Sequence, residues 1–355
     1  MMVDVGIVGF SQSTMLACEP EKTDAEMLSP VITEVLDGCG LKRQDVDFVV
    51  SGSTDYLSGI PFSFVHALDA IGVWPPVAES HVEMDAAWAF YEAWVKIQTG
   101  GAKIALVYGF GKSSTPNDLD QVMAMQLDPY HLVPLGIKPS SLAALQARIL
   151  LESGRATMED MALVAQRNLY QGQSNPWSLR SGNFSLDALL NAPKIAEPLS
   201  EFDCAPVTDG VAAMVVATKD VAEQLVERPV WVRGIDHRID PPAMGVRDLS
   251  DAPSARLACE KAGAHCDKLD VAEIYAPYSH QELILREVMG LASVEKLNPS
   301  GGVLCGHPIM SAGLIRIGEV FRYITEGKGD RGLGHATSGS CLQQNLVVTL
   351  EGKHG

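Results

Sequence analysis

The sequence of 355 residues is poor in positive charge and in long apolar runs. It has 27 lysines and arginines against 44 aspartates and glutamates, which gives a formal net charge of −17. This deficit argues against nucleic acid or an anionic membrane surface as a partner, because both need their phosphates neutralised. Nowhere do eighteen apolar residues follow one another, and the start, MMVDVGIVGF, lacks the basic residues and the apolar length of a signal peptide. We therefore expect a cytoplasmic protein.

Paired cysteines and nucleotide-binding loops are also missing. The seven cysteines form no CxxC pair and no repeated spacing, which argues against a disulfide framework and a structural zinc site. No stretch resembles a P-loop or GxGxxG, so we expect no metal and no tightly bound cofactor. The hydrophobic fraction of 46% and the charged fraction of 20% indicate a globular chain. The cysteines are Cys18, Cys39, Cys204, Cys259, Cys266, Cys305 and Cys341.

The chain contains the same pattern twice. In each copy a strand precedes a helix, a glycine break, a turn (KRQDVD or KLDVAE) and a second strand, followed by a long helix and a closing apolar strand. This predicts two duplicated halves, residues 1–225 and 226–355, packed as an α/β protein with five layers, α/β/α/β/α. The matching segments are 3–10 and 229–237, 30–55 and 254–278, 84–100 and 309–327, and 212–220 and 345–352.

Residues 114–200 have no counterpart in the second half. They are rich in methionine, proline, glutamine, asparagine and serine. We expect them to form an inserted loop domain that covers a site.

Four stretches resemble landmarks of the thiolase superfamily, and the resemblance covers nearly the whole chain. GGVLCGHPIMSAG (301–313) resembles its GGxxxxGHPxGxxG loop, and PLSEFDCAPVTDGVAAMVVAT (198–218) resembles the end of its first half. EIYAPYSHQEL (273–283) stands where the family has its NEAF or HDCF turn, and GLGHATSGSCLQQNLVVTLEG (332–352) stands at its last catalytic loop. The resemblance implies the five-layered thiolase fold, an acyl-CoA substrate and a homodimer.

The chain departs from the family where thiolases carry their nucleophilic cysteine. VEMDAAWAF places Met84 or Asp85 there, and no cysteine lies between Cys39 and Cys204. A carboxylate does not form a stable acyl-enzyme with a thioester as a thiolate does, so Claisen chemistry through an acyl-cysteine is not expected. Tyr275 also replaces the Asn or His of the NEAF or HDCF turn.

These departures most resemble the lipid-transfer-protein aldolases of steroid side-chain degradation, which are partnered by a small OB-fold protein of the DUF35 type. The resemblance implies retro-aldol cleavage of a β-hydroxyacyl-CoA, such as a 17-hydroxy steroid side-chain thioester, to a ketone and propionyl-CoA. Coenzyme A would then enter only as part of the substrate, and two DUF35-type chains would complete an α2β2 complex. Two alternatives stay open: an acyltransferase that uses Cys341 or Cys305, and a non-catalytic lipid carrier or scaffold.

A retro-aldol reaction needs a base for the hydroxyl proton, a donor to the enolate oxygen and a proton for the new α-carbon. We expect His307 to donate its Nε2–H to the thioester oxygen and Tyr275 to handle the hydroxyl proton. Tyr278 and His280, on the same turn, are possible substitutes for Tyr275.

Further candidates carry weaker signals. His335, near the family's second catalytic residue, is expected in a loop as a second acid/base. Cys341 follows it, and Asp85 is either a helix cap or a carboxylate that polarises a tyrosine or histidine. We expect contact with the coenzyme A portion at Gly301, Gly302, Gly306 and Ser311, and candidate phosphate contacts at Lys138, Arg148 and Arg167.

Overall fold

The computed structural model describes residues 3–72, 74–264 and 268–352. Cys266 lies outside these ranges. Among the described residues no helix combines the length and the apolar character needed to cross a membrane. The cytoplasmic location stays a prediction.

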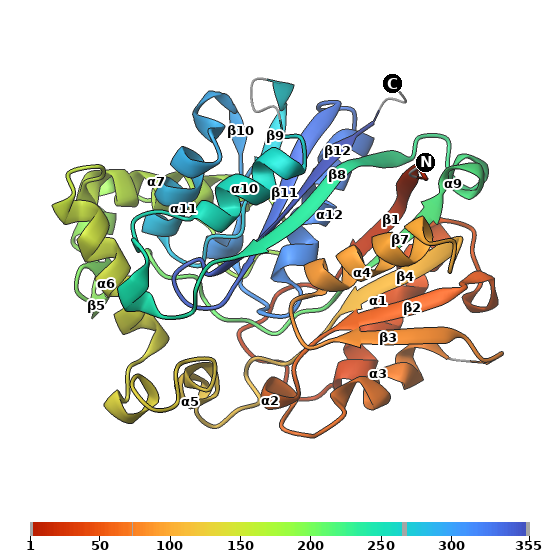
Figure 1. Ribbon diagram of the computed structural model, residues 1–355, viewed down its shortest axis with the longest axis horizontal. Helices are drawn as coiled ribbons and strands as arrows, with labels where there is room; N and C mark the ends of the chain where they lie inside the picture. Colours follow the sequence, from red (N-terminus) through yellow and green to blue (C-terminus); the bar gives the residue numbers. More distant parts are fainter. Residues whose placement is uncertain (1–2, 73, 265–267, 353–355) are drawn as a thin grey trace.

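One sheet runs through the centre of the molecule (Figure 1). In the described part of the chain it has ten strands in the order β10-β9-β11-β12-β8-β1-β7-β4-β2-β3. The two halves join where β1 and β8 pair antiparallel, Gly6 opposite Trp231 and Ile7 opposite Val230. The strands are β1 (Val5–Gln12), β2 (Phe48–Gly52), β3 (Ala78–Val82), β4 (Ile104–Gly109), β7 (Ala212–Thr218), β8 (Val230–Ile239), β9 (Val271–Glu273), β10 (Lys296–Leu297), β11 (Arg331–Ser338) and β12 (Gln344–Glu351).

The strand order reads the same way from both ends. β3, β2, β4, β7 and β1 take the places that β10, β9, β11, β12 and β8 take in the other half. This is the order that two copies of one β-α-β-α-β unit would give. The predicted boundary between residues 225 and 226 falls between helix α9 (Lys219–Leu225) and β8, and it stays a prediction.

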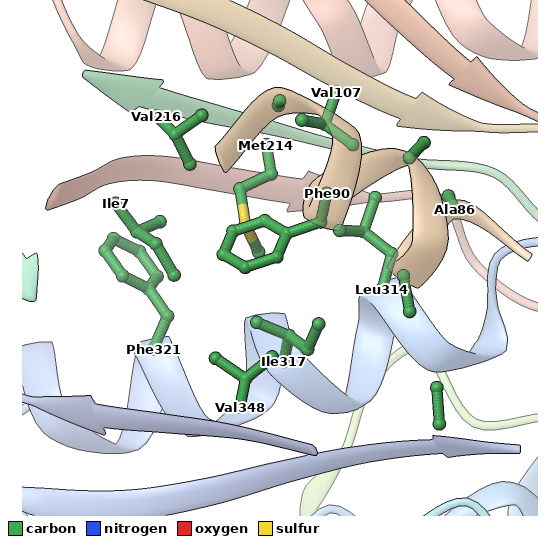
Figure 2. Close-up of a cluster of buried hydrophobic side chains, with 14 of the residues drawn as sticks. Ile7, Ala86, Phe90, Val107, Met214, Val216, Leu314, Ile317, Phe321 and Val348 are labelled. Carbon is green, nitrogen blue, oxygen red and sulfur yellow. The ribbon is translucent and has the colours of Figure 1, made fainter. Parts of the chain in front are cut away.

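The helices form three layers around the two halves of the sheet. Helices α4 and α12 lie between them, where Phe90, Leu314 and Ile317 pack with strand residues of both halves (Figure 2). Helix α1 covers the outer face of the first half, and α10 and α11 cover that of the second. The predicted five-layered α/β fold is therefore confirmed. These helices are α1 (Asp24–Gly38), α4 (Ala86–Gln98), α10 (Pro253–Lys261), α11 (Ser279–Val288) and α12 (Ala312–Thr325).

Strand β7 shows why the layers form. Ala212, Met214 and Val216 face the central helices, whereas Ala213, Val215 and Ala217 face α1. Because side chains alternate along a strand, an uninterrupted apolar run can only belong to a strand that is buried on both faces.

The structure adds elements that the sequence reading did not resolve. Residues 55–82 form α2 (Asp55–Ser58), α3 (Ser63–Ile71) and the edge strand β3. The segment 114–200 is mostly helical and contains α5 (Leu119–Ala124), α6 (Pro139–Glu152), α7 (Met158–Gln171), α8 (Leu186–Leu190) and β5 (Lys194–Ala196), which pairs with β6 (Leu199–Ser200). In Figure 1 its helices extend to one side of the sheet.

Candidate active site

A cavity of about 130 Å³ lies between the second half and the helices of the segment 114–200. Helices α5 and α6 form one wall, and residues 275–281, 307–310 and 337–342 form the others. The lining is largely apolar, as in most sites that bind organic ligands. Five of the predicted site residues line it: Asp85, Tyr275, Tyr278, His307 and Cys341.

Tyr275 and His307 are in direct contact in this cavity. The Oη of Tyr275 lies 2.5 Å from the Nε2 of His307, and the two rings meet edge to face. Tyr275 lies two residues beyond the end of β9, and His307 stands in the loop before α12. Strand β9 and the loop are brought together because Asn298 accepts the N–H of Ile274 and donates its own N–H to Ala272.

Burial keeps both groups of this pair neutral. It raises the pKa of Tyr275 well above 10, and the nearby Asp85 raises it further. Burial also lowers the pKa of His307 to about 4, with a smaller contribution from Arg316. A neutral phenol and a neutral imidazole can share one proton between Oη and Nε2. Because Nε2 faces the phenol, we revise the expected role of His307: its partner in the free protein is Tyr275 and not an incoming oxygen.

Asp85 joins the N-termini of the two central helices. It caps α4 by accepting the N–H of Ala87 at 2.7 Å, and its other oxygen accepts the N–H of Gly313 on α12, also at 2.7 Å. Of Met84 and Asp85, it is Asp85 that lines the cavity. Burial raises the pKa of Asp85 to about 7, partly offset by hydrogen bonds from Gly313, Ala87 and Leu314.

The raised pKa of Asp85 predicts a pH-dependent stability. The folded state favours the protonated acid more than the unfolded state does, where the pKa is about 3.9. This contribution is complete below about pH 4 and is lost as the pH rises through 7. Between pH 5 and pH 8 the wild type should lose about 2–3 kcal/mol relative to the Asp85→Asn variant, measured by urea unfolding. Parallel pH profiles of the two proteins would contradict the assignment.

His335 is not a loop residue. It lies in β11, opposite Val347, and is fully buried. Its Nδ1 accepts the backbone N–H of Tyr275 at 3.3 Å, and its Nε2 lies 3.0 Å from the Oδ1 of Asn345. Since both ring nitrogens are occupied and the ring does not line the cavity, His335 positions Tyr275. The structure does not support its expected role as a second acid/base.

His280 is also buried away from the cavity. It lies on α11, and its Nε2 contacts the Oε1 of Gln146 on α6 at 3.1 Å. Burial lowers its pKa to about 3. The expectation that His280 could replace Tyr275 as the base is therefore wrong, because the side chain of His280 does not line the cavity. Tyr278, at the start of α11, does line the cavity, and burial raises its pKa.

Neither candidate nucleophilic cysteine has thiolate character. Cys341 lines the cavity and its thiol contacts the carbonyl of Leu142 at 3.6 Å, while burial raises its pKa to about 11. Cys305 is fully buried outside the cavity, contacts the carbonyl of Asn168 at 3.3 Å and has a pKa raised to about 12. Thiols in such surroundings are poor nucleophiles.

This protonation predicts slow alkylation of Cys341. At pH 8, iodoacetamide should modify Cys341 at least about 100-fold more slowly than the exposed Cys18, because so little of a thiol with a pKa near 11 is ionised. Peptide mass spectrometry over time measures both rates. Labelling of Cys341 as fast as that of Cys18 would restore it as a candidate nucleophile.

The predicted contacts with coenzyme A in the glycine loop do not lie at the cavity. A Cβ on Gly301 would lie 2.6 Å from the sulfur of Cys305, and one on Gly306 would lie 2.6 Å from the sulfur of Met15. Both glycines therefore permit close packing. Gly302 adopts a φ of 61°, which favours glycine. Ser311 is buried, and its hydroxyl donates to the carbonyl of Gly210. A role for these four residues in binding stays a prediction.

The three candidate phosphate contacts differ in their availability. Arg167 is committed to Glu282, which is almost fully buried. Arg148 is exposed and lies 4.0 Å from Glu152 on the same helix. Lys138 precedes Pro139 of the cavity wall, is exposed and pairs with Asp120 at 3.0 Å. Lys138 is thus the cation of the three that lies beside the cavity.

Two features of the site were missed. Gln281 lines the cavity, and its signal was its spacing of three residues from Tyr278 on one helix. Behind Tyr275, Arg316 and Glu273 form a fully buried ion pair, with a contact of 2.5 Å from Nη1 to Oε2. The available signal for that pair was the place of Arg316 within the apolar run LIRI of α12 and of Glu273 at the end of the buried strand β9.

Comparison with known proteins agrees with this architecture. Residues 236–350 match the family model "Thiolase, C-terminal domain". An acetyl-CoA acetyltransferase of Methanocaldococcus jannaschii is 22% identical over 92% of this chain and 91% of its own length. Sterol carrier protein 2 of Bos taurus is 26% identical over 80% of this chain and 60% of that protein. The solved structure of an Ltp2-ChsH2(DUF35) aldolase matches 98% of both chains with a TM-score of 0.81 at 19% identity. Residues 236–350 therefore resemble the thiolase C-terminal domain, and the chain as a whole has the fold of these similar proteins.

Proposed function

We propose that this protein cleaves a β-hydroxyacyl-CoA by a retro-aldol reaction, giving a ketone and a shorter acyl-CoA. The contact between Tyr275 and His307 carries the proposal: it provides proton chemistry in a cavity whose cysteine is a protonated thiol. The preferred substrate is a 17-hydroxy steroid side-chain thioester, which would yield the 17-ketone and propionyl-CoA.

The net reaction transfers one proton from the substrate hydroxyl to the α-carbon. Tyr275 takes the proton of the substrate hydroxyl while its own proton passes to Nε2 of His307. The bond between the α- and β-carbons then breaks, leaving the ketone and the enolate of the thioester. One proton then returns from the pair to the α-carbon, and the pair regains its starting state, so atoms and charges balance without an external acid. The negative charge of the enolate favours the transient imidazolium next to it.

A likeness in fold and an exposed apolar surface support the proposed assembly. The similar solved structure bears a title that names a DUF35 protein in complex with an aldolase. In this chain large apolar side chains are exposed around α2 and α3, with Trp74 85%, Phe62 68% and Tyr56 59% exposed. We propose a homodimer that binds two OB-fold chains of the DUF35 type as an α2β2 complex.

Product analysis tests the proposed reaction. The purified protein, alone and with a DUF35-type partner, is incubated with a 17-hydroxy steroid C22 acyl-CoA. The expected products are the 17-ketone and propionyl-CoA in equal amounts. Intact binding of the thioester with no cleavage in either mixture would overturn the proposal and favour a carrier or scaffold.

Acyl transfer is the second candidate, because an acetyl-CoA acetyltransferase is among the relatives. It requires a cysteine to be acylated, and Cys341 is the cysteine at the cavity within the described residues. Incubation with acetyl-CoA would then add an acetyl group to the intact protein, and Cys341→Ala would abolish that mass increase. We expect no adduct.

A further inference from the structure

A chain of side-chain amides links helix α6 to the cavity. Gln146 of α6 is fully buried and donates its Nε2–H to the carbonyl oxygen of Leu249 at 2.9 Å. Its Oε1 lies 2.9 Å from the Nε2 of Gln281 and 3.1 Å from the Nε2 of His280. Gln281, on α11, is the member of the chain that lines the cavity.

The carbonyl of Leu249 fixes the direction of every hydrogen bond in this chain. A backbone carbonyl only accepts, so the amide nitrogen of Gln146 must face it and the amide oxygen must face α11. That oxygen in turn requires donors, which are the Nε2–H groups of Gln281 and His280. Rotating the amide of Gln281 would place two oxygens against each other. Its own oxygen, Oε1, therefore faces away from Gln146.

The Oε1 of Gln281 has no hydrogen-bond partner in the structure, although the residue is only 3% exposed. A buried acceptor without a partner is destabilising, and most such groups in proteins are satisfied. Gln281 cannot turn this oxygen toward a protein donor without breaking its bond to Gln146. A donor from a ligand in the cavity would satisfy it.

We propose that Gln281 accepts a hydrogen bond from an O–H or N–H group of the bound acyl thioester and thereby selects ligands that carry a donor at that position. The inference rests on the proposed function for the class of ligand. Two parts of an acyl-CoA carry such donors: a hydroxyl of the acyl group and the amides of the pantetheine arm. Gln281 lies one helical turn beyond Tyr278 on α11, the helix that follows Tyr275, so the donor would bind beside the proton-transfer pair.

The Gln281→Met variant tests this role without creating a new unpaired group. Methionine has a similar length and volume, and Gln146 Oε1 keeps the N–H of His280 as its donor. Since the substitution removes a buried unpaired acceptor, the free variant should be at least as stable to urea as the wild type. Gln173→Met, at an exposed glutamine outside the cavity, is the matched control and should bind like the wild type.

Binding is measured by calorimetry with two CoA thioethers, which cannot form an enolate and so are not cleaved. One carries the 17-hydroxy steroid side chain, and the other carries its 17-deoxy counterpart. We expect Gln281→Met to bind the hydroxy ligand about 10-fold more weakly than the wild type does. If the deoxy ligand is unaffected, the donor is the acyl hydroxyl; if both ligands lose affinity equally, the donor is a pantetheine amide.

Equal affinity of the wild type and Gln281→Met for both ligands would overturn the inference. Because the thioethers report binding alone, this result is independent of whether the wild type cleaves the corresponding thioester. A wild type that fails to cleave, with the binding difference present, would overturn the proposed reaction and leave the role of Gln281 standing.

Discussion

Tyr275→Phe is expected to lower the rate constant for ketone release by about 10²–10⁴, the usual contribution of a group that transfers a proton in the transition state. Phenylalanine keeps the edge-to-face contact with the His307 ring and removes only the Oη that lies 2.5 Å from Nε2. The ring stays in the central apolar cluster, so the fold should persist with a stability loss of about 1–3 kcal/mol from the unpaired imidazole. Rapid-quench kinetics at saturating substrate measure the effect.

Two controls separate the role of the phenol from a general loss of packing. Tyr108→Phe removes a hydroxyl from a tyrosine buried in the outer layer, away from the cavity, and should keep the wild-type rate within about twofold. His307→Gln should be about as slow as Tyr275→Phe, and the double variant no slower than either, because the two side chains act as one unit. Retention of the wild-type rate within about threefold by Tyr275→Phe would refute the assignment.

Arg316→Met is expected to cost about 3–5 kcal/mol of stability, the largest effect on folding that the structure predicts. Arg316 is 1% exposed and Glu273 is fully buried, and both also contact the hydroxyl of Ser300. Removal of the cation leaves a carboxylate buried without its partner, which is far more costly than the pair itself. Urea unfolding at pH 7 measures the loss.

The double variant Arg316→Met with Glu273→Gln provides the control for this ion pair. Because it removes both charges, it should recover at least about 1 kcal/mol relative to Arg316→Met alone. A loss below about 1 kcal/mol for the single variant would mean that Glu273 is protonated in the fold, a state that its raised pKa favours. The predicted coupling between the two substitutions would then vanish.

The architecture could be predicted from the sequence because its signals are local. Repeated helix, turn and strand patterns in two stretches of the chain depend on neighbours within a few residues, and the strand order confirms the layered fold that they indicate. Helix α4 likewise begins directly after Asp85, whose position before an apolar helical pattern is that of a cap.

The expectation of a loop at His335 came from the resemblance of residues 332–352 to a catalytic loop, and the structure shows a strand there. Gly332 and Gly334 lie in this strand, β11, and face α12. A Cβ on Gly332 would lie 2.4 Å from the side chain of Val320, and one on Gly334 would lie 3.0 Å from the backbone of Ile317. Close approach of a helix, which no local pattern encodes, explains these glycines.

The polar geometry of the cavity could not be predicted for a related reason. The unpaired oxygen of Gln281 is determined by the carbonyl of Leu249 through Gln146, and these three residues belong to different parts of the chain. The sequence places Tyr275 and His307 in the same site but does not predict their direct contact. The distance between the two side chains depends on how β9 and the loop before α12 pack together.

The central claim is that proton transfer by Tyr275 and His307 cleaves the substrate without an acyl-enzyme. Rapid quenching of one turnover, with mass spectrometry of the ketone, the acyl-CoA and the intact protein, tests it most directly. We predict that the ketone and the acyl-CoA appear together in equal amounts while the mass of the protein stays unchanged. Release of the ketone ahead of the acyl-CoA, with an acyl group added to the protein, would contradict the account.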